Sequence, residues 1–143
     1  MMDSNKNFAA IRELPPVEGD GVIVVSGDQL EMMPVRWLWP GWLAGGKLHL
    51  LAGEPGQGKT TIAAALAAIV SAGGTFPDGT PCEAGNVMFW SGEDDPADTL
   101  KPRLVAAGAD VKNVHFVTGM VVRGRDTVFS PARDMEALVA RYA

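Results

Sequence analysis

The stretch Gly53-Glu54-Pro55-Gly56-Gln57-Gly58-Lys59-Thr60 decides the expected fold. It has the spacing of a phosphate-binding loop, in which a glycine and four further residues precede Gly-Lys-Thr. The short apolar segment 47–52 before it predicts a buried strand. The alanine-rich segment 59–72 after it predicts a helix that ends at Gly73-Gly74. The loop is therefore expected between a strand and the N-terminus of a helix.

Each residue type in this loop has a chemical reason. Glycines permit left-handed backbone angles, so that successive amides wrap a phosphate, and the helix N-terminus adds partial positive charge. Lys59, one of the two predicted catalytic residues, is expected to reach the β- and γ-phosphates. The Thr60 hydroxyl is expected to bind Mg²⁺, and Thr61 to hold the loop or an α-phosphate. The predicted ligands of a nucleoside triphosphate are Gly53, Glu54, Pro55, Gly56, Gln57, Gly58, Lys59, Thr60 and Thr61.

A second group of polar residues follows another apolar segment. Residues 86–91 predict a buried strand, and Glu93, Asp94 and Asp95 come directly after it. Glu93 is the predicted catalytic base, because an acid at a strand end beside a phosphate loop can polarise the water that attacks the γ-phosphate. The alternatives are an acid that organises Mg²⁺ and, above all for Asp94 and Asp95, carboxylates that cap a helix.

The remaining pattern alternates strands and helices. Asp95-Pro96 predicts the start of a helix that runs to Ala107, residues 114–117 predict a third strand, and Ser130-Pro131 opens a last helix. Fully apolar strands between helices indicate an α/β fold, with a parallel sheet flanked by helices. Residues 1–33 are interpreted as a flexible lead-in, and residues 34–143 as the N-terminal portion of the folded domain.

Three of the four tryptophans lie close together, at positions 37, 39 and 42. Such a cluster is compatible with packing at the edge of a sheet, with a cover over the nucleotide base, or with stacking on single-stranded nucleic acid. Packing is the commonest of the three roles, and the sequence leaves the other two open.

Composition excludes several classes of protein. The formal net charge is −5, with 5 basic and 13 acidic residues in positions 1–100 and 7 basic and 4 acidic residues in positions 101–143. One cysteine cannot form an internal disulfide, and no pair of Cys or His residues has zinc-ligand spacing. No apolar run is long enough for a membrane span, and no signal peptide is evident, so a cytoplasmic protein is expected.

The chain resembles the RecA-like P-loop ATPases, and specifically the AAA-labelled ATPases of phage, plasmid and prophage replication modules. The resemblance covers more than half of the chain. It is carried by Trp-Leu-Trp-Pro-Gly at 37–41, Gly-Lys-Leu at 46–48, the loop at 53–61, Pro-Asp-Gly at 77–79, Gly-Asn-Val-Met-Phe-Trp-Ser-Gly-Glu-Asp-Asp at 85–95 and Asp-Thr-Leu-Lys-Pro-Arg-Leu at 98–104.

This resemblance implies a RecA-like fold in which the acid-bearing strand lies beside the loop strand, with Glu93 as the general base. It also implies hexameric rings, related to plasmid replicative helicases, that bind ATP at subunit interfaces and act on DNA. Members of the family continue into a strand that ends in a Mg²⁺-organising Asp, so the chain is expected to be the N-terminal part of a longer protein and inactive alone.

Three other functions are considered. A nucleotide-binding module without hydrolysis would have regulatory or structural use. A P-loop kinase of small molecules would carry an arginine-rich lid where residues 92–98 are instead acidic. A GTPase would carry an Asn-Lys-x-Asp motif, which does not occur in the 143 residues.

Overall fold

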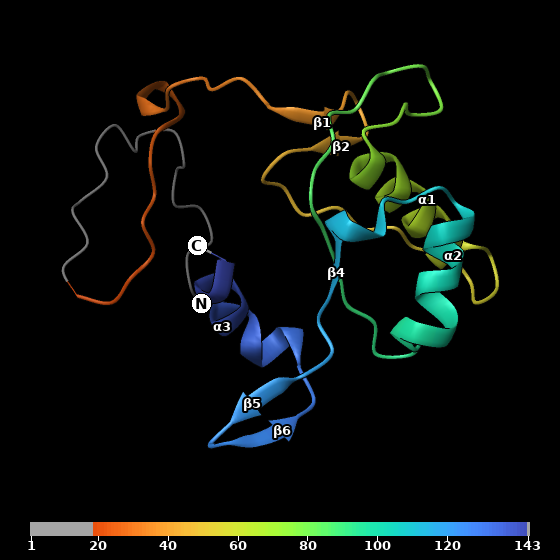
Figure 1. Cartoon of the computed structure of the whole chain (residues 1–143). Coiled ribbons are helices and arrows are strands. Elements are labelled where there is room, and N and C mark those ends of the chain that lie inside the picture. The colour runs from red at the N-terminus through yellow and green to blue at the C-terminus, as the bar shows by residue number, and fades with distance from the viewer. Residues whose placement is uncertain (1–18, 143) are drawn as a thin grey trace. The chain divides into compact units, whose positions relative to one another are not determined.

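The structure is a computed structural model that describes residues 19–142, with the side chains of residues 19–141. The chain divides into two units, Met1–Val35 and Arg36–Ala143. Described residues of the first unit form one short 3₁₀ helix, η2 (Gly27–Gln29), and are exposed (Figure 1). The predicted lead-in 1–33 lies outside the described residues over positions 1–18, and its boundary stays a prediction.

Within the described residues 36–142, the second unit forms three two-stranded sheets and three α-helices. Its elements are β1 (Trp37–Trp39), β2 (Leu43–Ala44), α1 (Lys59–Ala72), β3 (Val87–Phe89), η3 (Pro96–Leu100), α2 (Lys101–Ala106), η4 (Val111–Asn113), β4 (Val114–Phe116), β5 (Met120–Val122), β6 (Arg125–Thr127) and α3 (Pro131–Tyr142). No helix within residues 19–142 has the length and apolar character needed to cross a membrane.

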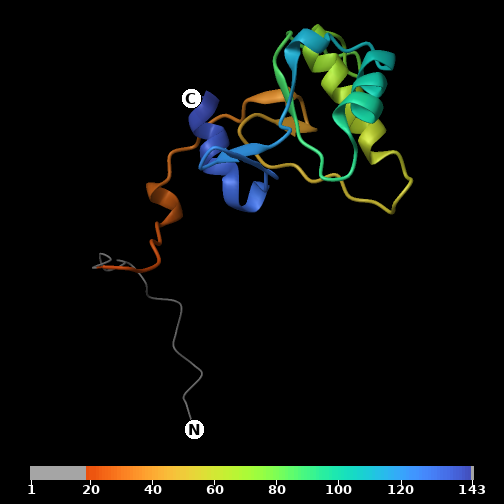
Figure 2. The same cartoon turned by 60° about the horizontal axis from the view of Figure 1, so that its bottom comes forward.

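The core lies where α1 and α2 pack against β3 and β4. Ala64 and Ala67 of α1 meet Leu104 of α2 and Val114 of β4, and all four side chains are buried. Small alanine side chains let the helix approach its neighbours closely. Both helices lie side by side next to β4 (Figures 1 and 2). Strands β3 and β4 pair in parallel, with Val87 opposite Val114.

The expected strand at 47–52 is not formed, so the prediction of a strand there is wrong. Leu48 and Leu50 are 98% and 91% exposed, and the segment has no strand assignment. A strand needs a partner for its N–H and C=O groups, and no other described strand pairs with this segment. Among the described residues, β3 and β4 are consequently the only parallel pair, and the acid-bearing strand is not paired with the loop segment.

The tryptophan cluster is partly a packing feature. The Trp39 ring stacks on Phe76, with centroids 4.8 Å apart and an angle of 2°, and its Nε1 donates a 2.8 Å hydrogen bond to Asp78. The ring of Trp42 stacks on the ring of Trp39, with the two centroids 5.3 Å apart. Packing therefore accounts for Trp39, whereas Trp37 and Trp42 remain 48% and 67% exposed.

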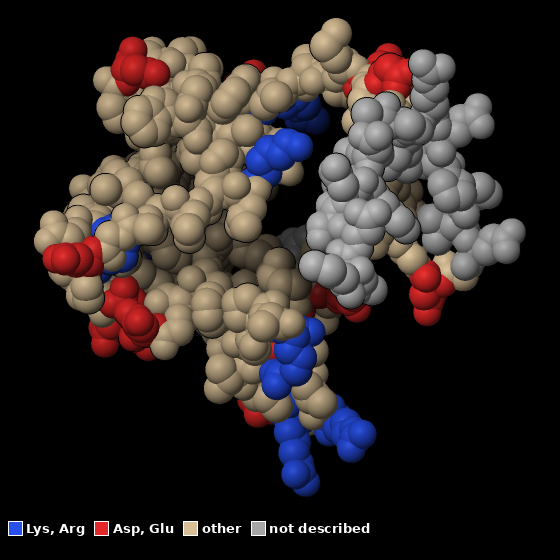
Figure 3. Space-filling view, turned by 180° about the vertical axis from the view of Figure 1, so that it is seen from behind, with Lys and Arg blue, Asp and Glu red and all other residues tan. Residues whose placement is uncertain are grey.

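Strands β5 and β6 form a hairpin whose turn residues, Arg123 and Gly124, have φ angles of 50° and 74°. Two left-handed residues in succession are typical of the type I′ turn, whose twist matches that of the flanking strands. Arg123 and Arg125 are exposed, and basic side chains gather over this hairpin in Figure 3.

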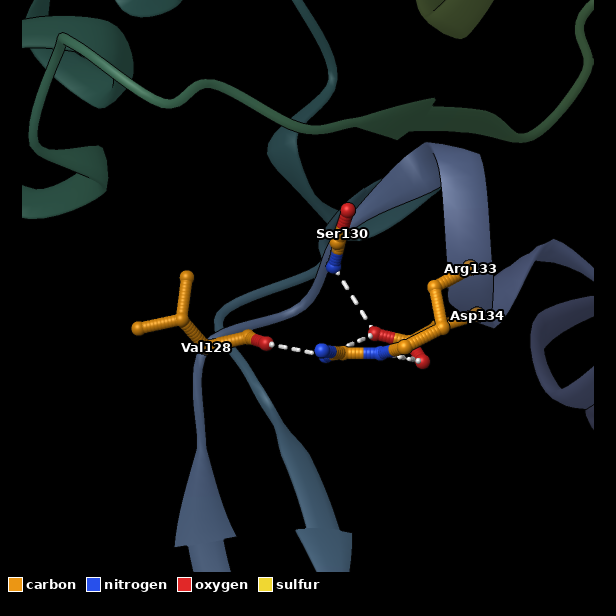
Figure 4. A network of polar contacts seen from close by, with 4 residues as sticks. All are labelled: Val128, Ser130, Arg133 and Asp134. Atoms are coloured by element: carbon orange, nitrogen blue, oxygen red, sulfur yellow. Dashed lines mark hydrogen bonds and ion pairs between the residues drawn. The ribbon is translucent and has the colours of Figure 1, made fainter.

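The start of α3 is held by a buried carboxylate. Asp134 accepts two hydrogen bonds from the Arg133 guanidinium, at 2.7 and 2.8 Å, and a third from the Ser130 amide at 2.9 Å (Figure 4). Arg133 also donates to the carbonyl oxygen of Val128. These donors hold the pKa of Asp134 below its ordinary value, chiefly through the Arg133 hydrogen bonds.

Candidate functional site

The loop between residues 53 and 58 leads directly into α1. Gly56 and Gly58 have φ angles of 79° and 78°, which side chains rarely tolerate. Gly53 does not have a left-handed angle. An added Cβ at Gly53 would instead lie 3.9 Å from Cδ of Lys59, in ordinary contact.

The first turn of α1 has no side chain bound to its free amides. Its N-cap is Gly58, which makes no side-chain capping hydrogen bond, and the first turn contains no acidic residue. Unsatisfied amides and the positive end of a 14-residue helix therefore remain available to an anion.

The ammonium group of Lys59 is turned back onto its own loop. Nζ donates hydrogen bonds to the carbonyl oxygens of Gly53 and Glu54, at 2.9 and 2.8 Å. The glutamate side chain takes no part in these bonds. These two contacts join the two ends of the loop, and they place the cationic group at its base.

A cavity of about 500 Å³ lies between the loop and the segment that follows β3. That volume is within the range of small-molecule sites. Its lining residues are Pro55, Gly56, Gly58, Lys59, Thr60, Thr61, Glu93, Asp94 and Arg103. The structure thus brings both predicted catalytic residues, Lys59 and Glu93, to one cavity with Thr60. Three of the predicted ligands lie outside this lining: Gly53, Glu54 and Gln57.

A serine fixes the turn that presents the acids. The Ser91 hydroxyl accepts hydrogen bonds from the amides of Glu93 and Asp94, at 3.2 and 2.9 Å. The carboxylate of Glu93 is exposed, so it can reach a water or an ion in the cavity. Sequence reasoning missed Ser91, although its place at the end of an apolar segment and two residues before Glu93 is a recognisable turn signal.

The three acids have separate roles in the structure. Asp95 caps the helix formed by η3 and α2, since its carboxylate accepts from the amides of Ala97 and Asp98 at 2.7 and 3.1 Å. The prediction of Asp95 as an N-cap before Pro96 is confirmed. Asp94 instead faces Arg103, with 3.9 Å between Oδ2 and Nη1. No role was predicted for Arg103, which belongs to the Lys-Pro-Arg-Leu segment.

A second cavity of about 450 Å³ adjoins the first and shares Lys59, Thr60, Glu93 and Asp94 with it. The rest of its lining is mainly apolar and includes Leu51, Ala63, Phe89, Trp90 and Leu100. The predicted site residues therefore lie between a polar space at the loop and a more apolar space beside β3.

The oxygen donors at the cavity fit Mg²⁺. No group of three or more His, Cys, Asp or Glu residues gathers in the part of the chain that the structure describes, so a cage made only of protein ligands is not found there. Magnesium commonly keeps waters and takes few protein ligands together with substrate phosphates. Thr60, Glu93 and Asp94 line the same cavity, so a hydroxyl and two carboxylates are available there for that coordination.

Comparison with known proteins points in the same direction. A family model described as "AAA domain" matches residues 13–143. A stretch of 36 residues is 58% identical to the "Putative ATPase Mb3704" of Mycobacterium bovis and to ATPase BagA of Mycobacterium tuberculosis. This stretch is 25% of the chain and 11% of each relative, so the match spans a small part of those longer proteins. No solved structure matches the chain.

Proposed function

The chain belongs to the AAA domain family, and on that premise we propose that it binds ATP with Mg²⁺ at the loop of residues 53–60. The observation that carries the proposal is the cavity of about 500 Å³, which is lined by Lys59, Thr60 and Glu93. It includes the N-terminus of α1, where no side chain caps the free amides. The α/β arrangement of loop, helix and parallel strand pair is in keeping with a P-loop nucleoside triphosphatase.

In this proposal the loop supplies most of the phosphate contacts. Amides of residues 56–61 and the N-terminus of α1 surround the phosphate chain, and Lys59 leaves the carbonyls of Gly53 and Glu54 to bind the β- and γ-phosphates. Thr60 contributes a hydroxyl ligand to Mg²⁺, which when bound neutralises charge on the phosphates. Thr61 lies in the same lining, at the start of α1, and contacts the α-phosphate or supports the loop.

Binding is tested by titrating fluorescent ATP with Mg²⁺ into the chain and its Lys59→Ala variant. Loss of a charge-assisted contact is expected to weaken binding by about 10- to 100-fold. Lys112→Ala is the matched control, because Lys112 is an exposed lysine outside the cavity. Equal affinity of the wild type and Lys59→Ala would overturn the proposed site.

We also propose that the longer protein hydrolyses ATP, with Glu93 as the residue that orients the attacking water. The carboxylate lies in the same cavity as Lys59 and Thr60, on a turn fixed by Ser91. Glu93 accepts a hydrogen bond from the water and takes its proton as the water oxygen bonds to the γ-phosphorus. The bond from the γ-phosphorus to the β,γ-bridging oxygen breaks in the same displacement, and ADP leaves with that oxygen.

The Glu93→Gln variant separates hydrolysis from binding. It keeps the size of the side chain, so ATP affinity is expected to stay within about threefold, whereas turnover falls by about 100-fold or more. Asp98→Asn, an exposed acid outside the cavity, is the control. ATP binding without turnover in the longer protein, unchanged by Glu93→Gln, would favour the alternative of a non-hydrolysing regulatory module.

The finer family assignment is part of the same proposal. Residues 34–143 would be the N-terminal portion of a RecA-like domain that assembles into a hexameric ring and acts on DNA in the replication or recombination of a mobile element. Support comes from the sequence resemblance and from the basic hairpin, where Arg123 and Arg125 are exposed. Single-stranded DNA is then expected to stimulate turnover of the longer protein, and the double change Arg123→Ser with Arg125→Ser is expected to reduce that stimulation.

A further inference from the structure

Arg103 faces the same cavity as the phosphate loop, and the nucleotide site described above gives it no role. We propose that Arg103 is a second cationic ligand of the nucleotide's phosphate chain, which lies beside Asp94 before the nucleotide binds and moves to the phosphates when it binds. This inference rests on the proposed function, and it adds a residue and a conformational step to that site.

The first support is the weakness of the contact that Arg103 now makes. Its Nη1 lies 3.9 Å from Oδ2 of Asp94, beyond hydrogen-bonding distance, and the two side chains are 48% and 30% exposed. An exposed ion pair of this kind adds little stability, so breaking it costs little free energy. Among the described residues, the Arg103 guanidinium makes no hydrogen bond, and all its N–H groups are available to a ligand.

Arg133 shows by contrast an arginine whose guanidinium is held by several hydrogen bonds. Its guanidinium binds Asp134 through two hydrogen bonds of 2.7 and 2.8 Å, and donates a third to the carbonyl oxygen of Val128. Asp134 is only 5% exposed. Arg133 is thus bound at the start of α3, whereas Arg103 makes only the 3.9 Å contact with Asp94.

The second support is the charge of the cavity. Four charged side chains line it: Lys59 and Arg103 are cationic, and Glu93 and Asp94 are anionic, so the sum is zero. Without Arg103 the same lining would carry one net negative charge, one cation against two anions. A polyanionic phosphate chain is repelled by such a lining, and Arg103 supplies the charge that offsets Asp94.

The third support is the rigidity of the backbone that carries Arg103. Leu100 and Leu104, on the two sides of it in the sequence, are each 1% exposed and anchor the helix in the core. Asp95 closes the N-terminus of that helix. Arg103 can therefore change its side-chain rotamer while its Cα stays in place. A planar guanidinium fork matches two phosphate oxygens, which is a reason for an arginine at this position.

Inorganic tripolyphosphate tests this assignment because it has the phosphate chain of ATP and no base. Both tripolyphosphate and ATP are titrated into the full chain and into Arg103→Ala, Arg103→Lys and Arg141→Ala. Arg103→Ala is expected to weaken both ligands by about tenfold. Arg103→Lys should recover part of the loss, and Arg141→Ala, which removes an exposed arginine of α3 outside the cavity, should have no effect.

The outcomes separate this inference from the proposed function. If Lys59→Ala weakens ATP binding and Arg103→Ala leaves tripolyphosphate binding unchanged, the inference fails and the nucleotide site stands. A loss confined to ATP would mean that Arg103 contacts the base, which also overturns the phosphate assignment. If the wild type binds neither ligand, the proposed function fails and the inference with it.

The position of Arg103 beside Asp94 is tested by a separate experiment. Asp94→Asn removes the partner charge, so tripolyphosphate is expected to bind about two- to fivefold more tightly. The titration is done with a chelator present, so that any role of Asp94 toward Mg²⁺ does not contribute. Unchanged or weaker binding would show that Asp94 does not compete with the phosphates for Arg103. The double change Asp94→Asn with Arg103→Ala should lose the gain.

Discussion

The ammonium nitrogen of Lys59 lies 2.9 Å from the carbonyl oxygen of Gly53, six residues earlier in the chain. The lysine is therefore already inside the loop, and two of its three N–H donors bind backbone carbonyls. A phosphate that enters the loop has to replace these carbonyls as acceptors, which ties a change in the backbone of the loop to binding.

Binding of Mg-ATP is expected to protect the loop amides from hydrogen exchange. Peptides covering residues 54–61 should exchange more slowly with the nucleotide, because their amides then donate to phosphate oxygens. In Lys59→Ala the protection should be largely absent at the same nucleotide concentration. Exchange in α3 serves as the internal reference and should not change. Protection of an unrelated segment, with none at the loop, would contradict the prediction.

Stability is expected to depend on the charge of Asp134. Its pKa is lowered in the folded state, first by the hydrogen bonds from Arg133 and then by the Ser130 amide. The stabilising contribution is therefore complete above the ordinary carboxyl pKa of about 3.9 and is lost as the pH falls through the lower folded value.

Urea unfolding of the wild type and Asp134→Asn, followed by circular dichroism between pH 7 and pH 3, measures this contribution. The variant should be less stable at pH 7, and the difference should shrink on acidification. Asp126→Asn is the control, because Asp126 is an exposed acid on β6. A difference between wild type and Asp134→Asn that stays constant across the whole range would contradict the assignment.

Trp39 and Trp42 offer a matched pair of substitutions. Trp39→Phe keeps an aromatic ring on Phe76 but removes the hydrogen bond to Asp78, so it should lower the free energy of unfolding. It should also raise the pKa of Asp78, which the Thr80 amide and then the Trp39 indole lower. Trp42→Phe, at a ring that is 67% exposed, should change the free energy of unfolding by less than about 0.5 kcal/mol. Equal losses would be evidence against a special role of Trp39.

The core between α1 and α2 is expected to be sensitive to side-chain volume. Leu104 is 1% exposed, and Leu104→Ala should lower the free energy of unfolding by about 2–5 kcal/mol. Its neighbour Val105 is 56% exposed, so Val105→Ala should cost less than about 1 kcal/mol. Denaturant midpoints of the two variants provide the comparison, and a Val105→Ala loss as large as that of Leu104→Ala would place the core elsewhere.

Local patterns predicted the helices well. Helix α1 spans Lys59–Ala72 as expected and ends at Gly73, whose left-handed backbone donates to the carbonyls of Ile69 and Val70. Asp95 caps the next helix, which ends before Gly108. These signals are contained in a few adjacent residues, so they do not depend on distant parts of the chain.

Features that need a distant partner were less accessible. The apolar run at 47–52 has the composition of a strand, but composition does not supply the neighbouring strand that it must pair with. Strands β5 and β6 were not predicted, because each is three residues long and its hydrogen-bonding partner is the other strand. At the site, no role was predicted for Arg103. Its ion pair with Asp94, nine residues earlier in the chain, depends on the direction in which the helix carrying Arg103 runs.

The exposed leucines at 48 and 50 have a consequence for handling the protein. An extended apolar segment with free backbone edges is a template for intermolecular sheet formation. At the concentrations used for scattering or spectroscopy, the isolated polypeptide is therefore expected to form oligomers, and its solutions are expected to become turbid. Replacement of either leucine by a polar residue should prevent this association.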